Sequence, residues 1–389
     1  MNKMLRQLLL LVLLFGGCSS DPIPLPTVDR PDTEYDMAVD ASADLSADAQ
    51  VDVSDDLSLT DSGADAQIDA DLGSDMGSQL THQAIVNLRP AFTDFSNLTP
   101  WIKGISHIRV WGGSRGMATY PTLEAVPDVL LQNPNRFNLV QDEEIANLLA
   151  LQTMHGVKTI YLININDSLE SQLAFVQRLM DEGLDLDFVE LGNELYLRKF
   201  AEGDLTGLGV TRAWSVEQYI DEIIDVWTLA FKELGLPVYI VGASHGTDDS
   251  NSTMYRQNWN SALVSALATR PGLVDGVTFH RYGGEERTGE THEEIISNES
   301  FQFLQTFGAL PIAITESGYF FTEMTPENLE LAAEFWTAFR AALKPNDHYG
   351  VHVMQRSGMA TGDLSYGLYD DNGLSPVGAR FDAWLKTGE

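Results

Sequence analysis

Two glutamates end short apolar segments that lie far apart in the chain. Glu194 follows Asn193 directly after the segment 187–192, and Glu316 closes the segment 311–316. A pair of carboxyl groups can divide acid catalysis and nucleophilic attack between them, because one group holds a proton while the other stays ionised. The two side chains must face each other for this chemistry, so the elements that carry them decide whether it is possible.

Eight short runs rich in Val, Ile, Phe and Tyr are candidates for those elements. Near-continuous apolar runs are typical of parallel strands that are covered on both faces. Each glutamate stands at or just after the end of one such run. We expect strands at 83–88, 106–111, 157–164, 187–192, 237–243, 275–281, 311–316 and 350–355.

Helix signals separate these strands. Asp167 with Glu170 is typical of a capping box, and Gly183 of the end of the same helix. Strands that alternate with helices imply βαβ units, and eight of them predict a closed (β/α)8 barrel. A doubly wound open sheet is the alternative, although no Gly-rich phosphate turn follows the first strand. Further helices are expected over 141–154, from Ser215 to about Gly235, and from Thr325 to about Leu343.

A barrel of this kind would bring the two glutamates together. Catalytic groups of (β/α)8 barrels lie at the C-terminal ends of the strands. Glu194 at the fourth strand and Glu316 at the seventh would then face each other across the mouth, which is the arrangement that glycoside hydrolysis requires. Arg109 on the second strand, and His280 and Tyr282 on the sixth, would stand beside them.

These motifs resemble the clan of (β/α)8 retaining glycoside hydrolases that includes cellulases, mannanases and heparanase-like enzymes. The clan has its acid/base glutamate after an asparagine at strand four, which matches Asn193-Glu194, and its nucleophile at strand seven, which matches Glu316. Its His-x-Tyr motif at strand six matches His280 and Tyr282. The resemblance implies double-displacement hydrolysis of β-linked bonds in a poly- or oligosaccharide, without a cofactor.

The branch within this clan stays open. The segments 188–196 and 275–283 look most like the heparanase and glucuronidase branch. That branch has one residue between its strand-two arginine and a Gly-Gly pair, whereas Arg109 is followed by two residues before Gly112. Sugar, linkage and endo or exo action are therefore not predicted. Arg281 and Arg356 are candidates for holding a uronate carboxylate.

Roles for the neighbouring side chains follow from the same chemistry. Asn193 could bind the 2-hydroxyl group of a sugar, and Tyr282 and Arg109 could donate hydrogen bonds that keep Glu316 anionic. For Arg109 and His280, structural hydrogen bonding is the favoured interpretation. Sugars stack on aromatic rings, and Tyr196 and Tyr319, which follow the two glutamates closely, are the first candidates. Other candidate rings are Trp111, Tyr120, Trp259 and Tyr282, whereas Trp214, Trp227 and Trp336 are expected in the core.

Other chemistries have weaker support. The eight histidines show no metal-ligand spacing, since His348 and His352 are four apart on a strand-like segment, so no metal site is predicted. Ser244 lies in a Gly-x-Ser-x-Gly pattern that matches a nucleophile elbow in spacing, but a loop rich in Asp, Asn and Ser follows it instead of a helix. A serine hydrolase remains an alternative that would need a His and an Asp beside Ser244.

The N-terminal region has a different composition. Lys3 and Arg6 precede an apolar run that ends just before Cys18, the only cysteine. Residues 1–18 resemble a bacterial lipoprotein signal, with a plain secretory signal as the alternative. Residues 19–80 contain fifteen Asp, one Glu and one Arg, and this composition predicts a disordered tether. We expect one barrel domain over 81–389, exported and held by lipid on Cys18 at a bacterial, outer-membrane surface.

The net charge limits the partners. The chain has 57 acidic and 23 basic residues and a formal charge of −34. Nucleic-acid binding needs clustered Lys and Arg, so this balance argues against it. We expect a monomer whose partner is a carbohydrate and whose membrane contact is the lipid alone. A non-catalytic glycan-binding lipoprotein on a degenerate barrel is the alternative function, although both glutamates are present.

Overall fold

The structure is a computed structural model, and part of the chain can be described in it. The predicted signal, the tether and Cys18 lie outside the described residues, as do His352 and Arg356. The described residues are 83–88, 103–113, 116–198, 212–244, 256, 258–284, 288–321, 323–345, 347–351, 368–370 and 373–387.

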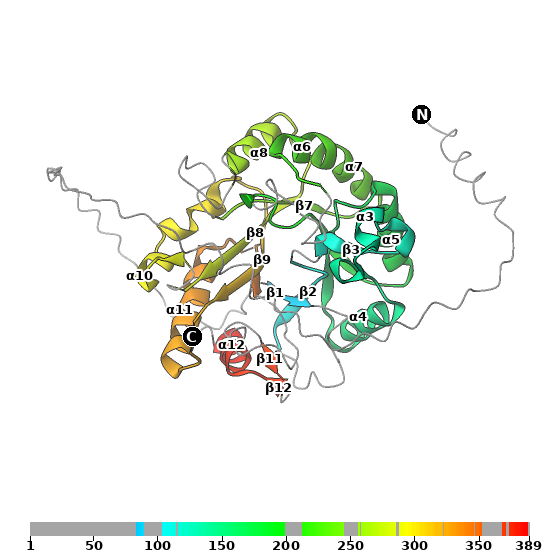
Figure 1. The fold of residues 1–389 in the computed structure, drawn as a ribbon. Coiled ribbons are helices and arrows are strands. Elements are labelled where there is room, and N and C mark those ends of the chain that lie inside the picture. Colours follow the sequence, from blue (N-terminus) through cyan, green and yellow to red (C-terminus); the bar gives the residue numbers. More distant parts are fainter. Residues whose placement is uncertain are drawn as a thin grey trace, which may run out of the picture.

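Eight parallel strands form a closed barrel, which confirms the predicted (β/α)8 class (Figure 1). Strand β1 pairs with β2 on one side and with β10 on the other, so the sheet has no free edge and the open-sheet alternative is wrong. Around the barrel the order is β1-β10-β9-β8-β7-β6-β5-β2. The strands are β1 (Gln83–Leu88), β2 (Ile105–Val110), β5 (Lys158–Ile163), β6 (Leu186–Leu191), β7 (Val238–Val241), β8 (Gly276–Gly283), β9 (Ile312–Tyr319) and β10 (His348–Val351).

Helices surround this barrel (Figure 1). The long ones are α4 (Asp142–His155), α5 (Leu169–Asp181), α7 (Asp225–Glu233), α8 (Trp259–Ala268), α11 (Pro326–Ala342) and α12 (Pro376–Thr387). Shorter ones are α3 (Asp128–Leu131), α6 (Val216–Gln218), a π-helical turn (Tyr219–Ile224) that joins α6 to α7, α10 (His292–Ile295) and a 3-10 segment (Glu299–Gln305). Two small sheets pair β3 (Thr119–Tyr120) with β4 (Asn138–Leu139), and β11 (Tyr369–Asp370) with β12 (Gly373–Leu374).

The helix ends follow local side-chain chemistry. Ser215 and Thr325 cap their helices as predicted, each accepting a hydrogen bond from a backbone N–H three residues later. The predicted cap at Asp167 is wrong by one residue, because the hydroxyl of Ser168 accepts the bond from the backbone N–H of Ser171. Asp167 instead accepts a bond from the backbone N–H of Ser168.

The core has two parts. The larger part lies between the strands and the helices, and it includes the rings of Trp336, Phe381 and Trp384. The smaller part is a buried layer inside the barrel, which we call the apolar belt; it consists of Ile85, Ile160, Phe188, Tyr239 and Ala313. On β2 and β6, polar residues lie both before and after the level of the apolar belt. The interior of the barrel therefore has one polar cluster near the N-terminal ends of the strands and another near their C-terminal ends.

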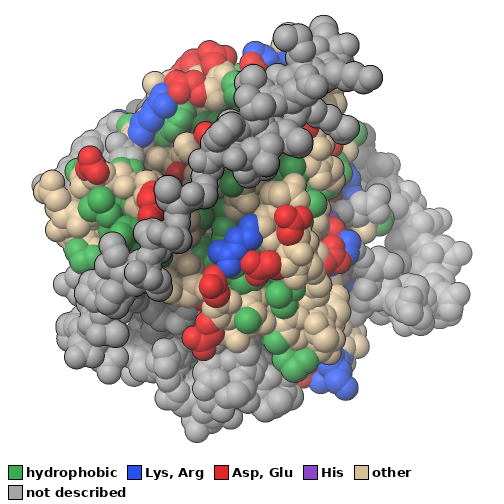
Figure 2. All heavy atoms as spheres, turned by 90° about the vertical axis from the view of Figure 1, so that its right-hand side faces the viewer, with side chains coloured by type: hydrophobic (Ala, Val, Ile, Leu, Met, Phe, Trp, Pro, Cys, Tyr) green, Lys and Arg blue, Asp and Glu red, His purple; other side chains and the backbone are tan. Residues whose placement is uncertain are grey.

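One side of the outer surface carries both acidic and basic side chains. Figure 2 shows the side of α4 and α5, on which acidic and basic side chains are interspersed with small apolar groups. Arg178 there is ion-paired with Asp142 and Glu182. Among the residues that the structure describes, no helix is both long enough and apolar enough to cross a membrane.

Candidate active site

Arg109 is at the centre of the polar cluster at the C-terminal end of the barrel. Its side chain is fully buried, and its guanidinium group reaches four partners. Nε donates to Oε2 of Glu190 at 2.5 Å, Nη1 to Oε1 of Glu316 at 2.6 Å and to Asn87, and Nη2 to Oδ1 of Asn193 at 2.9 Å. Burial alone would lower the pKa of Arg109, but the carboxylates of Glu190 and Glu316 raise it above its ordinary value. The guanidinium therefore remains a fixed positive charge.

Glu316 is held at both carboxylate oxygens. Oε1 accepts the bond from Arg109, and Oε2 accepts a bond from the hydroxyl of Tyr282 at 2.7 Å. The side chain is only 5% exposed. Donors to both oxygens stabilise the ionised form of a carboxyl group and fix its orientation. Strand β9 thus presents an oriented carboxylate at the mouth of the barrel.

His280 contacts both Glu194 and the carboxylate of Glu316. Nδ1 of His280 lies 3.0 Å from Oε1 of Glu194 and 3.5 Å from Oε2 of Glu316. Contact atoms of these three side chains all lie within 4.8 Å of one another. Burial disfavours a charged imidazole, but the charges of Glu316 and Glu194 raise the pKa of His280 above its ordinary value. The structure thus brings Glu194 of the segment after β6 and Glu316 of β9 to the same imidazole ring.

Backbone geometry after β6 places Glu194. Gly192 and Glu194 both have left-handed φ angles, of 90° and 47°. A non-glycine residue in this region costs of order 1 kcal/mol or more and is concentrated at functional sites. The turn lets Asn193 point to Arg109 while Glu194 points to His280.

Two further polar residues support the site, and neither was predicted. Glu190 is fully buried and accepts hydrogen bonds from Arg109 and from the hydroxyl of Thr315. Asn87 accepts from Arg109 and donates to the backbone carbonyl of Thr315. A charged or amide residue that directly follows apolar residues near the C-terminal end of a strand is the sequence signal that could have drawn attention to both, because such a residue must find a partner inside the barrel.

Close backbone approach explains the glycine after Trp111. A Cβ atom on Gly112 would lie 2.5 Å from Nη1 of Arg109 and 2.6 Å from Oδ1 of Asn87. Any side chain at this position would displace the guanidinium group from its partners. The Arg-x-x-Gly spacing that departs from the heparanase-like pattern therefore still brings a glycine against the arginine.

Three of the aromatic residues predicted to stack on sugars are buried. Trp111, Tyr196 and Tyr319 are at most 6% exposed. Trp111 packs edge-on against Tyr161 and Phe175, and the hydroxyl of Tyr319 contacts Nδ1 of His292 at 2.8 Å. The stacking role predicted for these three rings finds no exposed ring face, because a position after a strand does not fix the direction of a side chain.

Partly exposed rings are present at the mouth. Tyr282 and Phe320 are half-buried, with ring centroids 5.4 Å apart. Trp214, Trp227 and Trp336 are buried, as expected.

Two other predicted candidates are engaged in hydrogen bonds of their own. Arg281 is buried and donates to Ser300 and Glu290 in the helical layer, so its guanidinium is engaged there. The hydroxyl of Ser244 donates to the backbone carbonyl of His280. A nucleophilic serine needs its proton directed at a base, so this arrangement does not support the serine hydrolase alternative.

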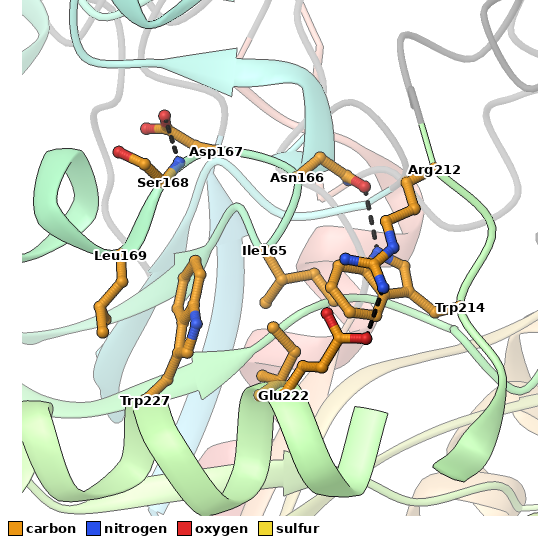
Figure 3. A pocket seen from close by; sticks show the side chains of 10 residues that line it. Ile165, Asn166, Asp167, Ser168, Leu169, Arg212, Trp214, Glu222 and Trp227 are labelled. Carbon is orange, nitrogen blue, oxygen red and sulfur yellow. Dashed lines mark hydrogen bonds and ion pairs between the residues drawn. The ribbon is translucent and has the colours of Figure 1, made fainter. Parts of the chain in front are cut away.

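A separate pocket lies on the same end of the barrel. Its volume is about 300 Å³, and it is formed by the residues after β5 and around the start of α6 (Figure 3). The guanidinium of Arg212 lies 4.0 Å from the ring centroid of Trp214 and is ion-paired with Glu222 at 2.6 Å. None of the candidate catalytic residues lines this pocket, so we assign it no role in the chemistry.

Comparison with known proteins identifies solved structures that have a similar fold. The sequence matches no protein-family model and no curated protein. Among solved structures, one similar fold is AbfB, a family 51 α-L-arabinofuranosidase from Bifidobacterium longum, with a TM-score of 0.52 and 13% identity over 79% of this chain and 72% of that one. Another is the endo-β1,6-glucanase BT3312, with a TM-score of 0.51 and 14% identity over 78% of this chain and 75% of that one.

This chain shares the (β/α)8 barrel fold of these two glycoside hydrolases. The fold that the strand-end motifs imply is therefore confirmed. At such low identity the likeness concerns the barrel alone, and the chemistry must be argued from the side chains at its mouth.

Proposed function

We propose that the chain is a retaining glycoside hydrolase that cleaves β-linked bonds of a poly- or oligosaccharide. The observation that carries this proposal is the pairing of Glu194 and Glu316, which approach each other and His280 to within 4.8 Å between contact atoms. Retaining enzymes place their two carboxyl groups roughly 5–5.5 Å apart, whereas inverting enzymes leave about 6.5–9.5 Å for a water molecule. The narrow gap favours retention.

In the first step, Glu316 is the nucleophile. One of its oxygens attacks the anomeric carbon while Glu194 gives a proton to the glycosidic oxygen, and the bond from the anomeric carbon to that oxygen breaks. Arg109 and Tyr282 fix the orientation of the attacking carboxylate. The products of this step are a glycosyl ester on Glu316, an ionised Glu194 and the released alcohol.

In the second step, Glu194 acts as the base. It takes a proton from a water molecule, which attacks the anomeric carbon and releases Glu316 as a carboxylate. The raised pKa of His280 favours a protonated ring. Nδ1 of His280 lies 3.0 Å from Oε1 of Glu194 and orients this carboxyl group for both proton transfers.

Asn193 supports the same assignment. Its Oδ1 accepts from Arg109, and its buried Nδ2 has no hydrogen-bond partner among the described residues. A sugar 2-hydroxyl group entering the mouth would supply that partner. This contact strengthens in the transition state of retaining glycosidases.

The test is an activity screen of the protein and its carboxylate variants. The panel holds aryl glycosides, including α-L-arabinofuranoside, and β-1,3-, β-1,4- and β-1,6-glucans. Hydrolysis by the wild type that is lost in Glu194→Gln and Glu316→Gln, with a first product of retained anomeric configuration by NMR, is the expected result. Binding of a glycan without turnover would instead establish the non-catalytic alternative, and an inverted product would refute the nucleophile role of Glu316.

We further propose that the chain is exported and anchored by a lipid on Cys18. The support is the position of the only cysteine directly after a basic and apolar leader. Cells fed with labelled palmitate should incorporate label into the wild type but not into Cys18→Ser. Label retained by Cys18→Ser would refute the anchor.

A further inference from the structure

A second polar cluster lies inside the barrel near the N-terminal ends of the strands. It consists of His107 on β2, Asp187 on β6 and His348 on β10, and we call it the lower cluster. Oδ2 of Asp187 lies 3.1 Å from Nε2 of His107 and 3.7 Å from Nε2 of His348. One potential ligand atom from each residue lies within 4.8 Å of the other two. Both histidines thus direct the same ring nitrogen at one carboxylate oxygen.

Ser106 lies against the other ring nitrogen of His107. The hydroxyl of Ser106 is 3.2 Å from the backbone carbonyl of Ala84 and 2.9 Å from Nδ1 of His107. In the tautomer with the proton on Nδ1, the ring donates to the serine oxygen and Nε2 directs a lone pair at the Asp187 carboxylate. This tautomer is the one that can bind a metal ion through Nε2.

His107 is 2% exposed, so its ring is removed from solvent and contacts the protein alone.

His348 faces the same carboxylate from the other side. It is 8% exposed, and neither of its ring nitrogens has a hydrogen-bond partner within the described part of the chain. Buried polar groups without a partner are rare in folded proteins and call for an explanation. Its ring packs edge-on against His107, with centroids 4.9 Å apart, and this contact fixes its position beside Asp187.

We propose that His107, Asp187 and His348 bind one divalent transition-metal ion of the Zn²⁺ type, through the two Nε2 atoms and Oδ2. Tetrahedral zinc has bonds of about 2.0–2.1 Å to nitrogen and oxygen, which separates its ligand atoms by about 3.3 Å. The two measured separations from Oδ2 fall on either side of this value. Two imidazoles and one carboxylate leave a fourth position for water.

The residues around the lower cluster suit metal ligands. A ligating histidine ordinarily donates its other ring N–H to an oxygen, and the hydroxyl oxygen of Ser106 lies 2.9 Å from Nδ1 of His107, where it can accept such a bond. The ammonium group of Lys158 holds the other oxygen, Oδ1 of Asp187, at 2.8 Å and so leaves Oδ2 for the ion. Asp187 is 22% exposed, which gives an ion a path from solvent.

The three acidic and imidazole groups at the mouth are a less suitable set. Glu194, His280 and Glu316 are also close enough to share an ion. There, however, Arg109 and Tyr282 donate to the two oxygens of Glu316, so a cation and a hydroxyl proton already occupy the positions that a metal would take.

Sequence spacing gave no sign of the lower cluster. His107 and Asp187 are 80 residues apart, and all three ligands stand on different strands. None of these strands neighbours another in the barrel, because β1 separates β2 from β10 and β5 separates β2 from β6. An ion here would therefore connect three strands that share no backbone hydrogen bonds.

The test is Zn²⁺ titration of the tag-free, full-length protein after treatment with a chelator, by calorimetry and by metal analysis. The wild type should bind one Zn²⁺ that is absent, or at least tenfold weaker, in His348→Phe and in Asp187→Asn. His348→Phe keeps a ring of similar shape, and Asp187→Asn provides a second variant if the first does not fold. His155→Ala, at the exposed end of α4, and Glu316→Gln should bind like the wild type.

Cobalt provides an independent readout. Co²⁺ in the wild type should give visible absorption bands of a low-coordinate nitrogen and oxygen site, and these bands should be missing in His348→Phe and Asp187→Asn. The proposal is overturned if the wild type binds no Zn²⁺, if both cluster variants bind it as tightly as the wild type, or if Glu316→Gln alone removes the binding. The last result would place the ion at the mouth.

Discussion

The two polar clusters inside the barrel differ in the charged groups that surround their buried carboxylates. At the mouth, the charge of Arg109 is directed at Glu190 and Glu316. In the lower cluster, Asp187 faces two imidazoles, and its nearest full cation, Lys158, contacts only one of its oxygens. The apolar belt lies between the two. The comparison teaches that the mouth fixes two carboxylates on one buried guanidinium group, whereas the lower cluster surrounds one carboxylate with a partly exposed lysine and two imidazoles.

The largest expected effect concerns turnover. Glu316→Gln should lower kcat by about 10³-fold or more, because the amide cannot form the glycosyl ester. Circular dichroism should show a retained fold. Treating the wild type with a chelator should leave kcat within about twofold, because the lower cluster takes no part in the chemistry. Loss of turnover on chelation would show that the two ends are not separate in function.

The second prediction compares the cations of the two ends. Arg109→Met should lower the free energy of unfolding by about 3–5 kcal/mol, because it leaves two buried carboxylates without a counter-charge. Lys158→Met should cost less than about 1 kcal/mol, because the lysine is 46% exposed and its ion pair is screened by water. Urea denaturation measures both. A larger loss for Lys158→Met would reverse the proposed difference.

The third prediction concerns thermal stability. Zn²⁺ at about 100 times its dissociation constant should stabilise the wild type by about 2.7 kcal/mol, and raise Tm by roughly 5 °C. Asp187→Asn should show no such rise, and Glu316→Gln should show the full one. Differential scanning calorimetry measures these shifts, and an equal rise in all three proteins would point to unspecific binding.

The smallest expected effect distinguishes the two ends by pH. The raised pKa of His280 contributes stability below the ordinary pKa of histidine, and this contribution is lost as pH rises through the folded value. The lowered pKa of His107 has the opposite sign, so acidification below the ordinary value destabilises the fold. Each can change the free energy of unfolding by at most about 1.4 kcal/mol per pH unit.

Proton NMR of the imidazole resonances, with chelator present, measures both pKa values directly. His280→Gln and His107→Gln assign the two resonances. If the two rings titrate at the same pH, the electrostatic difference between the clusters does not exist.

The strands and the central pair could be predicted because they depend on local signals. Apolar runs mark strands that are buried on both faces, and the C-terminal strand ends of a barrel converge, so Glu194 and Glu316 had to meet once eight strands were recognised. The caps at Ser215 and Thr325 depend on neighbours within three residues, and they too were predicted.

What could not be predicted depends on contacts between distant strands. The partners of Arg109 on β1 and β6, Asn87 and Glu190, follow from the register between strands, which periodicity within one strand does not contain. The lower cluster could not be predicted for the same reason, because its three residues stand on different strands. The burial of Trp111 and Tyr319, which were predicted as sugar platforms, has a related reason, since their rings pack against Phe175 of α5 and Phe335 of α11.

The distance along the sequence between Arg109 and its partners also has a consequence for folding. The partners of Arg109 are separated from it by 22, 81, 84 and 207 residues. Contacts over such separations form slowly, because the intervening chain must first be ordered. Strands from both halves of the sequence have to assemble before Glu316 is oriented. During refolding, recovery of catalytic competence should therefore coincide with the closure of the barrel and follow the formation of the individual helices.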